Sequence, residues 1–120
     1  MIIAIPVNEN KAEPSVCVSF GRAPWFYFRN TETATSQVLA NPAAIAEGGA
    51  GVKAAQFVID HHADALITVR GGENAAEVLL AAEVQIYKAQ GGGALENLAA
   101  LAEGKLERLQ SFHAGFHNKQ

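Results

Sequence analysis

Short apolar runs alternate with polar or glycine-rich stretches along the chain, and their periodicity predicts a succession of strands and helices. The isoleucine-rich run Met1–Val7 ends at Pro6 and a polar stretch, a pattern that favours a strand buried on both faces. Aromatic residues dominate Trp25–Asn30, and a polar turn then leads to Ser36–Ala40. We expect these two segments to pair as a hairpin.

The period changes to that of a helix at Ala50. Apolar positions of this first predicted helix recur at helical spacing: Val52, Ala55, Val58, Ile59 and His62. The later predicted elements alternate strand and helix in the order Ala65–Val69, Asn74–Glu83, Val84–Tyr87 and Ala94–Glu103. Gly104 is well placed to end the last helix.

This order of elements predicts an α/β fold built on a five-stranded mixed sheet. Short strand–helix–strand crossovers require parallel neighbours, whereas the hairpin arms run antiparallel. The strand order 3-2-1-4-5, with strand 2 antiparallel, satisfies both requirements. The chain leaves strands 1 and 4 in different directions, so their shared carboxyl end is a topological switch point, where open α/β sheets bind ligands.

The length of 120 residues predicts one domain over residues 1–109, followed by a loosely attached tail over residues 110–120. With 49% hydrophobic and 18% charged residues, the chain can bury a core without disulfides. A net charge of −3 with scattered basic residues predicts no binding to nucleic acid or anionic membranes. The opening residues reach proline and polar residues too early for a signal peptide or a membrane span, so we expect a cytoplasmic protein.

Three loops of unusual composition converge on the predicted switch point. Two of them open helices, whose N-termini would direct unsatisfied N–H groups and partial positive charge into one crevice. This is chemistry for an anion or an anionic metal cluster, with Cys17 as the only soft metal ligand available. The candidate cofactor-binding residues are Cys17, Ser19, Gly21, Arg22, Gly48, Gly49, Gly51, Arg70, Gly71, Gly72 and Asn74.

Each of these features also has a purely structural interpretation. A glycine-rich helix start can be a tight turn, and a lone cysteine can be a small buried residue. Arg70 could simply pair with Glu73 or Glu77. The chain lacks a complete P-loop, a dinucleotide fingerprint, CxxC, HExxH and a nucleophile elbow, so no familiar catalytic motif decides between these interpretations.

The four histidines fall outside the three loops. His61 and His62 end the first long helix, where a cation interacts favourably with the helix dipole, and we expect a structural role. His113 and His117 lie four residues apart and could hold one metal ion if the tail were helical. Because the tail offers no third ligand, we expect both to be surface residues.

Several segments match one known family in order, through about residue 109: the opening strand, Phe20–Pro24 (FGRAP), Asn41–Ala43, Gly48–Ala55 (GGAGVKAA), Asp64–Thr68, Gly72–Ala75 and Val84–Tyr87. Together they resemble the dinitrogenase iron–molybdenum cofactor biosynthesis family. The resemblance implies a ribonuclease H-like three-layer α/β/α fold with the sheet order given above. The members of this family that are linked to nitrogen fixation bind or carry the iron–molybdenum cofactor or its iron–sulfur precursor. This chain resembles the stand-alone members, many of which occur outside nitrogen fixation.

Two departures from the family change the expected ligands. The family often has a histidine immediately before Phe-Gly-Arg, where this chain has Ser19, and often a histidine or cysteine before the Gly-Gly-Ala-Gly turn, where it has Glu47. Cys17 could substitute as the metal ligand, or the site could hold a different anionic ligand.

Three classes of function stay open. The leading hypothesis is a non-enzymatic binding or carrier protein for an iron–sulfur or iron–molybdenum type cluster or a related anionic cofactor, with a cofactor-donor or acceptor protein as partner. The second is a small enzyme with Cys17 as nucleophile, activated by Arg22 or Arg70. No histidine in the three loops can act as its base. The third is a regulatory or interaction protein with a vestigial crevice.

Overall fold

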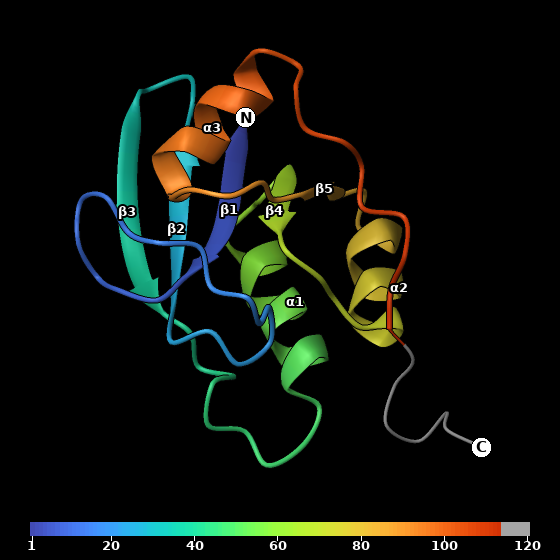
Figure 1. Ribbon diagram of the computed structural model, residues 1–120. Helices are drawn as coiled ribbons and strands as arrows, with labels where there is room; N and C mark the ends of the chain where they lie inside the picture. Colours follow the sequence, from blue (N-terminus) through green and yellow to red (C-terminus); the bar gives the residue numbers. More distant parts are fainter. Residues whose placement is uncertain (114–120) are drawn as a thin grey trace.

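Five strands and three helices make up the part of the computed structural model that is described, residues 1–113 (Figure 1). The strands are β1 (Ile2–Val7), β2 (Trp25–Asn30), β3 (Thr35–Ala40), β4 (Ala65–Thr68) and β5 (Gln85–Lys88). The helices are α1 (Ala50–Asp60), α2 (Glu73–Ala81) and α3 (Ala94–Ala102). The sheet order is β3-β2-β1-β4-β5, with β2 antiparallel to both neighbours and β4 and β5 parallel to β1. The predicted α/β fold and strand order are therefore confirmed.

The continuous apolar run of β1 accounts for its place in the middle of the sheet. Residues Ile3–Val7 are all buried, as expected for a strand covered on both faces. Val7 pairs with Trp25 of β2, and Ile3 pairs with Ala65 of β4. The carboxyl ends of β1 and β4 consequently lie at the same edge of the sheet.

The two faces of the sheet are covered by different helices (Figure 1). On one face, α1 and α2 bury small residues against an aromatic cluster centred on Phe26, whose ring lies 5.6 Å from Phe20 and 6.0 Å from Phe57 between centroids. On the other face, α3 packs over the opposite side chains of β1 and β4, with Leu106 completing that cluster. The result is the three-layer arrangement that the sequence predicts.

The apolar face predicted for α1 is partly wrong. Val52 is 39% exposed, and His62 lies beyond the end of the helix with φ of 64°. Ala54, which the predicted face omits, is buried instead. The physical reason is the helix end: the N–H of His62 donates to the carbonyl of Ile59 (2.9 Å), and the N–H of Ala63 donates to that of Val58 (3.1 Å). This Schellman motif turns His62 away from the helical surface.

The segment after α3 runs along the outer edge of β5. The Lys88 N–H donates to the Glu107 carbonyl (2.8 Å), and the Leu109 N–H donates to the Ile86 carbonyl (2.9 Å). The chain then reaches the start of α2 at His113. The boundary predicted at residue 109 stays a prediction, because residues 114–120, including His117, lie outside the described residues. No helix within residues 1–113 is long and apolar enough to cross a membrane.

Candidate functional site

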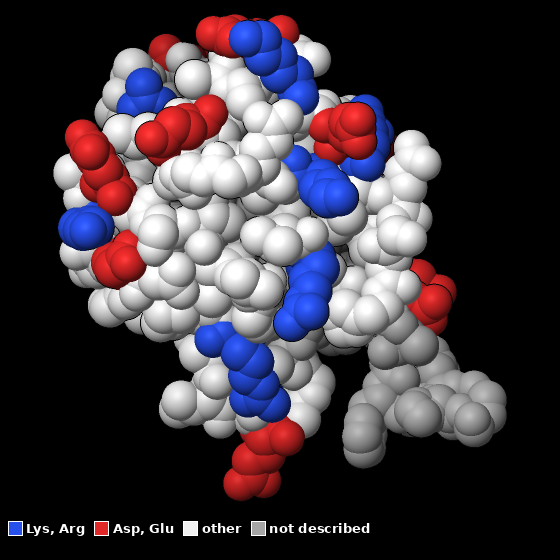
Figure 2. Space-filling view, viewed as in Figure 1, with Lys and Arg blue, Asp and Glu red and all other residues white. Residues whose placement is uncertain are grey.

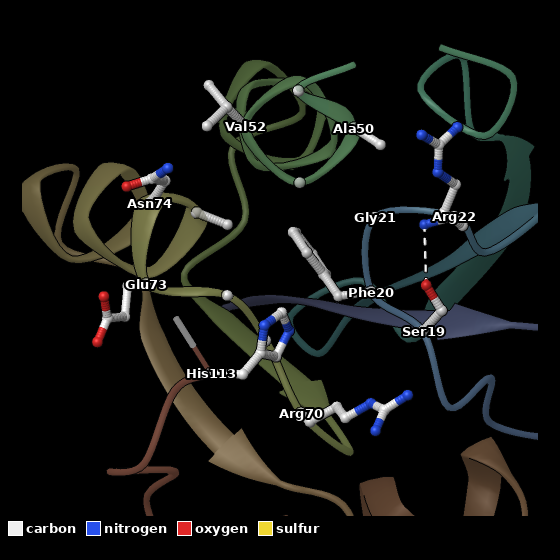
Figure 3. A pocket seen from close by; sticks show the side chains of 15 residues that line it. Ser19, Phe20, Gly21, Arg22, Ala50, Val52, Arg70, Glu73, Asn74 and His113 are labelled. Carbon is white, nitrogen blue, oxygen red and sulfur yellow. Dashed lines mark hydrogen bonds between the residues drawn. The ribbon is translucent and has the colours of Figure 1, made fainter. Parts of the chain in front are cut away.

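A cavity of about 570 Å³ opens at the carboxyl ends of β1 and β4, where the topology predicts a ligand site (Figure 3). Its volume lies within the range of roughly 300–1,000 Å³ common for small-molecule sites. Four segments contribute to it: the loop after β1, the first turn of α1, the turn into α2, and the segment after α3 that reaches His113. The lining residues are Ser19, Phe20, Gly21, Arg22, Gly49, Ala50, Gly51, Val52, Arg70, Gly71, Gly72, Glu73, Asn74, Ala75 and His113.

The loop after β1 lies directly against the first turn of α1, and Gly21 makes this approach possible. A Cβ atom on Gly21 would lie 2.8 Å from the backbone nitrogen of Gly51 and 3.1 Å from the carbonyl carbon of Ala50. Both neighbours are backbone atoms, which cannot rotate away. The Ser19 hydroxyl accepts a hydrogen bond from the Arg22 N–H (3.0 Å) and closes the turn around this glycine (Figure 3).

Asn41 holds the other side of the same loop. It is only 5% exposed, and its Nδ2 donates to the carbonyls of Gly21 (3.0 Å) and Ala23 (2.8 Å). Its Oδ1 accepts from the Ala43 N–H (3.0 Å). All of its polar atoms are thus occupied in positioning the cavity wall. Asn41 belongs to one of the segments that carry the family resemblance, but its sequence context does not predict this role.

Two helices begin at the cavity without a side-chain cap. Gly49 precedes α1 in the left-handed region (φ 67°), and Gly72 precedes α2 in an extended conformation (φ −84°). Because glycine has no side chain, neither residue offers a side-chain acceptor to the N–H groups of the first helical turn. Within residues 1–113, no acceptor is present for the backbone N–H groups of Ala50, Gly51, Val52, Asn74 and Ala75. These donors and the positive ends of both helix dipoles favour an anion.

The two arginines of the cavity have different surroundings. Arg22 Nη1 donates to the carbonyls of Ala44 and Ala46, so its guanidinium fixes the loop before α1. Arg70 is exposed and forms no ion pair with Glu73, Glu77 or any other residue of the described part. Its charge is therefore available to a ligand. Figure 2 shows basic side chains down the middle of the visible face, with acidic side chains around them.

His113 also belongs to the cavity lining. Its N–H donates to the Gly71 carbonyl (3.1 Å), and its own carbonyl accepts from the Glu73 N–H (3.0 Å). These bonds fix the backbone on both sides of the imidazole, which points into the cavity (Figure 3). His113 is exposed, as the sequence predicts, but its place at the site was missed, because no local pattern reveals where a segment after the last helix returns.

Nine of the eleven predicted site residues line the cavity, and Cys17 and Gly48 do not. The Cys17 N–H donates to the Pro6 carbonyl (2.8 Å), and the preceding Val16 forms a bridge with Val7. This pairing keeps the half-buried Cys17 beside β1, before the loop reaches the cavity. Within residues 1–113, no three His, Cys, Asp or Glu residues lie close enough to hold a metal ion together. The prediction of Cys17 as the metal ligand thus gains no geometric support.

A carboxylate outside the cavity holds the first part of the same loop. Glu9 accepts hydrogen bonds from the N–H (2.7 Å) and hydroxyl (2.9 and 3.0 Å) of Ser15. The backbone hydrogen bond, followed by the hydroxyl contacts and the nearby charge of Lys11, lowers the pKa of Glu9 from its ordinary value. The ionised form of Glu9 therefore stabilises this loop.

His61 and His62 lie at the opposite end of the sheet, as predicted. The His61 ring stacks on Phe28 with centroids 5.2 Å apart, and its Nδ1 lies 2.9 Å from the Phe57 carbonyl oxygen. His61 lines a surface hollow with Ile2 at the start of β1. The predicted structural role of His61 fits these contacts.

Comparisons with known proteins give the same fold. A family profile described as "Dinitrogenase iron-molybdenum cofactor" matches residues 1–104. An uncharacterised protein of Methanocaldococcus jannaschii is 27% identical over 113 residues, 92% of either chain. The chain is similar to a Thermotoga structure provisionally named as a NifB protein, with 35% identity and a TM-score of 0.81 over 93% of this chain and 96% of that one. It also shares its fold with the apo form of the orange protein of Desulfovibrio gigas, with 23% identity and a TM-score of 0.86 over 92% and 93%.

Proposed function

Because the chain belongs to the dinitrogenase iron–molybdenum cofactor family, we propose that it is a small non-enzymatic carrier of a preassembled anionic metal cluster, of the iron–sulfur or iron–molybdenum type. The cluster is its cargo and binds in the cavity at the carboxyl ends of β1 and β4. A donor or acceptor protein of the cluster is the expected partner. The observation that carries the proposal is the convergence of Arg70 with two uncapped helix N-termini on one cavity.

The donor set favours a preassembled cluster over a resident metal ion. A structural metal ion or a resident iron–sulfur cluster usually needs about four protein ligands, and cysteine thiolates dominate the latter. Among residues 1–113, the cavity lining contains no cysteine, and His113 supplies its one imidazole. A cluster that brings its own sulfide bridges and negative charge needs fewer protein ligands. Backbone N–H groups and Arg70 can hold such an anion through charge-assisted hydrogen bonds.

The same donor set is suited to release. Hydrogen bonds to backbone N–H groups break without any change in covalent or coordination chemistry, whereas several thiolates would need to be exchanged one by one. Most of the lining is backbone and small side chains, so an acceptor protein could approach the cargo closely. The enzyme alternative loses its motivating observation, because Cys17 lies outside the cavity lining.

Anaerobic reconstitution tests the proposal. The wild-type chain is incubated with a preformed iron–sulfur cluster that carries exchangeable small-thiol ligands, desalted, and analysed for iron, sulfide and visible absorption. We expect a cluster to stay bound to the wild type and Arg70→Ala to weaken its binding about ten- to a hundredfold. Arg29→Gln is the matched control, because Arg29 Nη1 donates to Ala34 and Ser36 at the far end of the sheet.

Cluster retention and alkylation of Cys17 together separate the carrier from the enzyme and from the regulatory or interaction protein. A wild-type chain that retains no iron and sulfide contradicts the carrier proposal. Fast stoichiometric alkylation of Cys17 at neutral pH, without cluster uptake, would favour the enzyme. Absence of both reactions would favour the regulatory or interaction protein.

A further inference from the structure

We infer that His113 is a ligand-binding residue of the cavity, and that its imidazole makes the site selective for metal-containing anions over simple oxyanions. The inference rests on the proposed function and deepens it. The segment that carries it, Lys105–His113, is here called the C-terminal strap. It lies outside the three loops that form the rest of the site.

The strap is fixed to the domain by side chains at regular intervals. Leu106 is buried in the core cluster on the α3 face, and Leu109 and Phe112 are partly buried against the cluster on the face of α1 and α2. The guanidinium of Arg108 lies over the Tyr87 ring, 5.1 Å from its centroid. Phe112 contributes to a small apolar hollow below the turn into α2, next to Phe20. These contacts place the next residue, His113, at the cavity.

His113 is then placed by its own backbone. It is bonded to Gly71 on one side and to Glu73 on the other, a short parallel bridge that fixes the direction of its side chain. The imidazole lies beside Gly72: a Cβ atom there would be 3.2 Å from Cε1, 3.7 Å from Nε2 and 3.8 Å from Nδ1. The lack of a side chain at Gly72 therefore leaves room for the ring in the cavity.

The chemistry of the imidazole differs from that of every other donor in the cavity. Backbone N–H groups and Arg70 bind any anion of suitable size, because they recognise charge and hydrogen-bond acceptors. An imidazole nitrogen also donates a lone pair to a metal atom, and iron and molybdenum clusters have such metal atoms whereas phosphate has none. The combination selects an anion that carries a metal atom with an exchangeable position.

The test compares three full-length variants with the wild type in the anaerobic reconstitution with the preformed iron–sulfur cluster. His113→Ala and His113→Gln remove the imidazole, and the second keeps a polar side chain of similar reach. His62→Asn is the matched control, since it removes an exposed imidazole at the other end of α1 and asparagine tolerates the left-handed conformation there. Circular dichroism and thermal unfolding confirm that each variant folds.

We expect both His113 variants to bind the cluster at least about tenfold more weakly, with an altered absorption spectrum, and His62→Asn to match the wild type. Free imidazole added to His113→Ala should restore the spectrum, which a merely structural role would not do. Affinity for inorganic phosphate, measured by calorimetry, should fall much less in His113→Ala than affinity for the cluster, because phosphate loses at most one hydrogen bond and the cluster loses a metal ligand.

Three results would overturn the inference, and they remain distinguishable. If the wild type binds a cluster and both His113 variants bind it equally well, the inference is wrong and the carrier proposal stands. A loss that imidazole does not restore likewise removes the ligand role and leaves a structural one. If the wild type retains no cluster, both the carrier proposal and this inference are wrong.

Discussion

The helix termini at the two ends of the sheet differ in whether their backbone groups are hydrogen-bonded. Where α1 and α2 end, most of the last-turn carbonyls accept hydrogen bonds from the residues that follow: the N–H groups of His62 and Ala63 close α1, and those of Glu83 and Val84 close α2. Where the same helices begin, glycine precedes them. Within residues 1–113, most of their first-turn N–H groups lack an acceptor, and that of Glu73 donates to the His113 carbonyl. Folding alone favours satisfied termini. The end that leaves its donors available is therefore the end that we assign to ligand binding.

The strongest test of this contrast is Gly21→Val, at the end of the sheet where the cavity lies and α1 and α2 begin. The new side chain would meet the backbone of α1 at 2.8–3.1 Å, so the loop must move away from the helix start. We expect a loss of about 3 kcal/mol in the free energy of unfolding, the upper part of the usual range for overpacking. Urea denaturation measures it, and Gly48→Val is the control, because no atom lies within 4 Å of a Cβ there. Equal stability of the two variants would show that the loop is free to shift.

Ile59→Ala tests the packing at the opposite end of the sheet, where α1 ends. Ile59 packs against the main core cluster but is only partly buried. The free energy of unfolding should therefore fall by about 1–2 kcal/mol, less than the roughly 2–5 kcal/mol typical of a fully buried isoleucine. The same denaturation series gives this value. Cluster retention should stay at the wild-type level, and its loss would contradict the separation of the two ends.

His62→Gly should stabilise the protein. His62 adopts a φ of 64°, which strains a residue with a Cβ atom but not glycine. We expect a gain of about 0.5–1 kcal/mol in the free energy of unfolding, seen as a higher melting temperature. The converse change, Gly104→Ala, places a Cβ at a φ of 74° at the end of α3 and should destabilise by a similar amount. A loss of stability in His62→Gly would mean that the imidazole makes a contact worth more than the strain.

The smallest effect concerns the pH dependence of the loop held by Glu9. Because folding lowers the pKa of Glu9 below its ordinary value of 4.5, the unfolded state binds its proton first as the pH falls. Its contribution is thus fully present above the unfolded pKa and is lost as the pH falls through the folded pKa. Unfolding curves of wild type and Glu9→Gln should differ at neutral pH and converge in acid. A difference that persists unchanged at pH 3 would contradict this role.

The order and direction of the strands could be predicted because each rests on local information. The apolar run of β1, the aromatic hairpin and the two short crossovers leave one arrangement, and the observed registers follow it. The glycine-rich starts of α1 and α2 were predictable for the same reason. Composition identifies them, and the topology brings them together.

The rest of the site depends on contacts between distant segments, which no local pattern contains. Cys17 was predicted in the cavity from its position in the loop, but the bond from its N–H to the Pro6 carbonyl keeps it beside β1. The role of Asn41 depends on carbonyls eighteen and twenty residues away. His113 reaches the cavity only because the C-terminal strap follows β5 after α3. The positions of such residues at the site follow only from the path of the chain in the folded structure.

The path of the C-terminal strap along β5 also determines whether a strand of another molecule can pair with that edge of the sheet. An unpaired edge strand invites another strand to extend the sheet, which is a common route to aggregation. At β5, the strap already takes up hydrogen-bonding groups of Ile86 and Lys88, so this edge is closed to a second chain. The opposite edge is β3, whose first half, Thr35–Gln37, is polar and exposed. Strand addition between copies is thereby blocked at one edge and discouraged at the other.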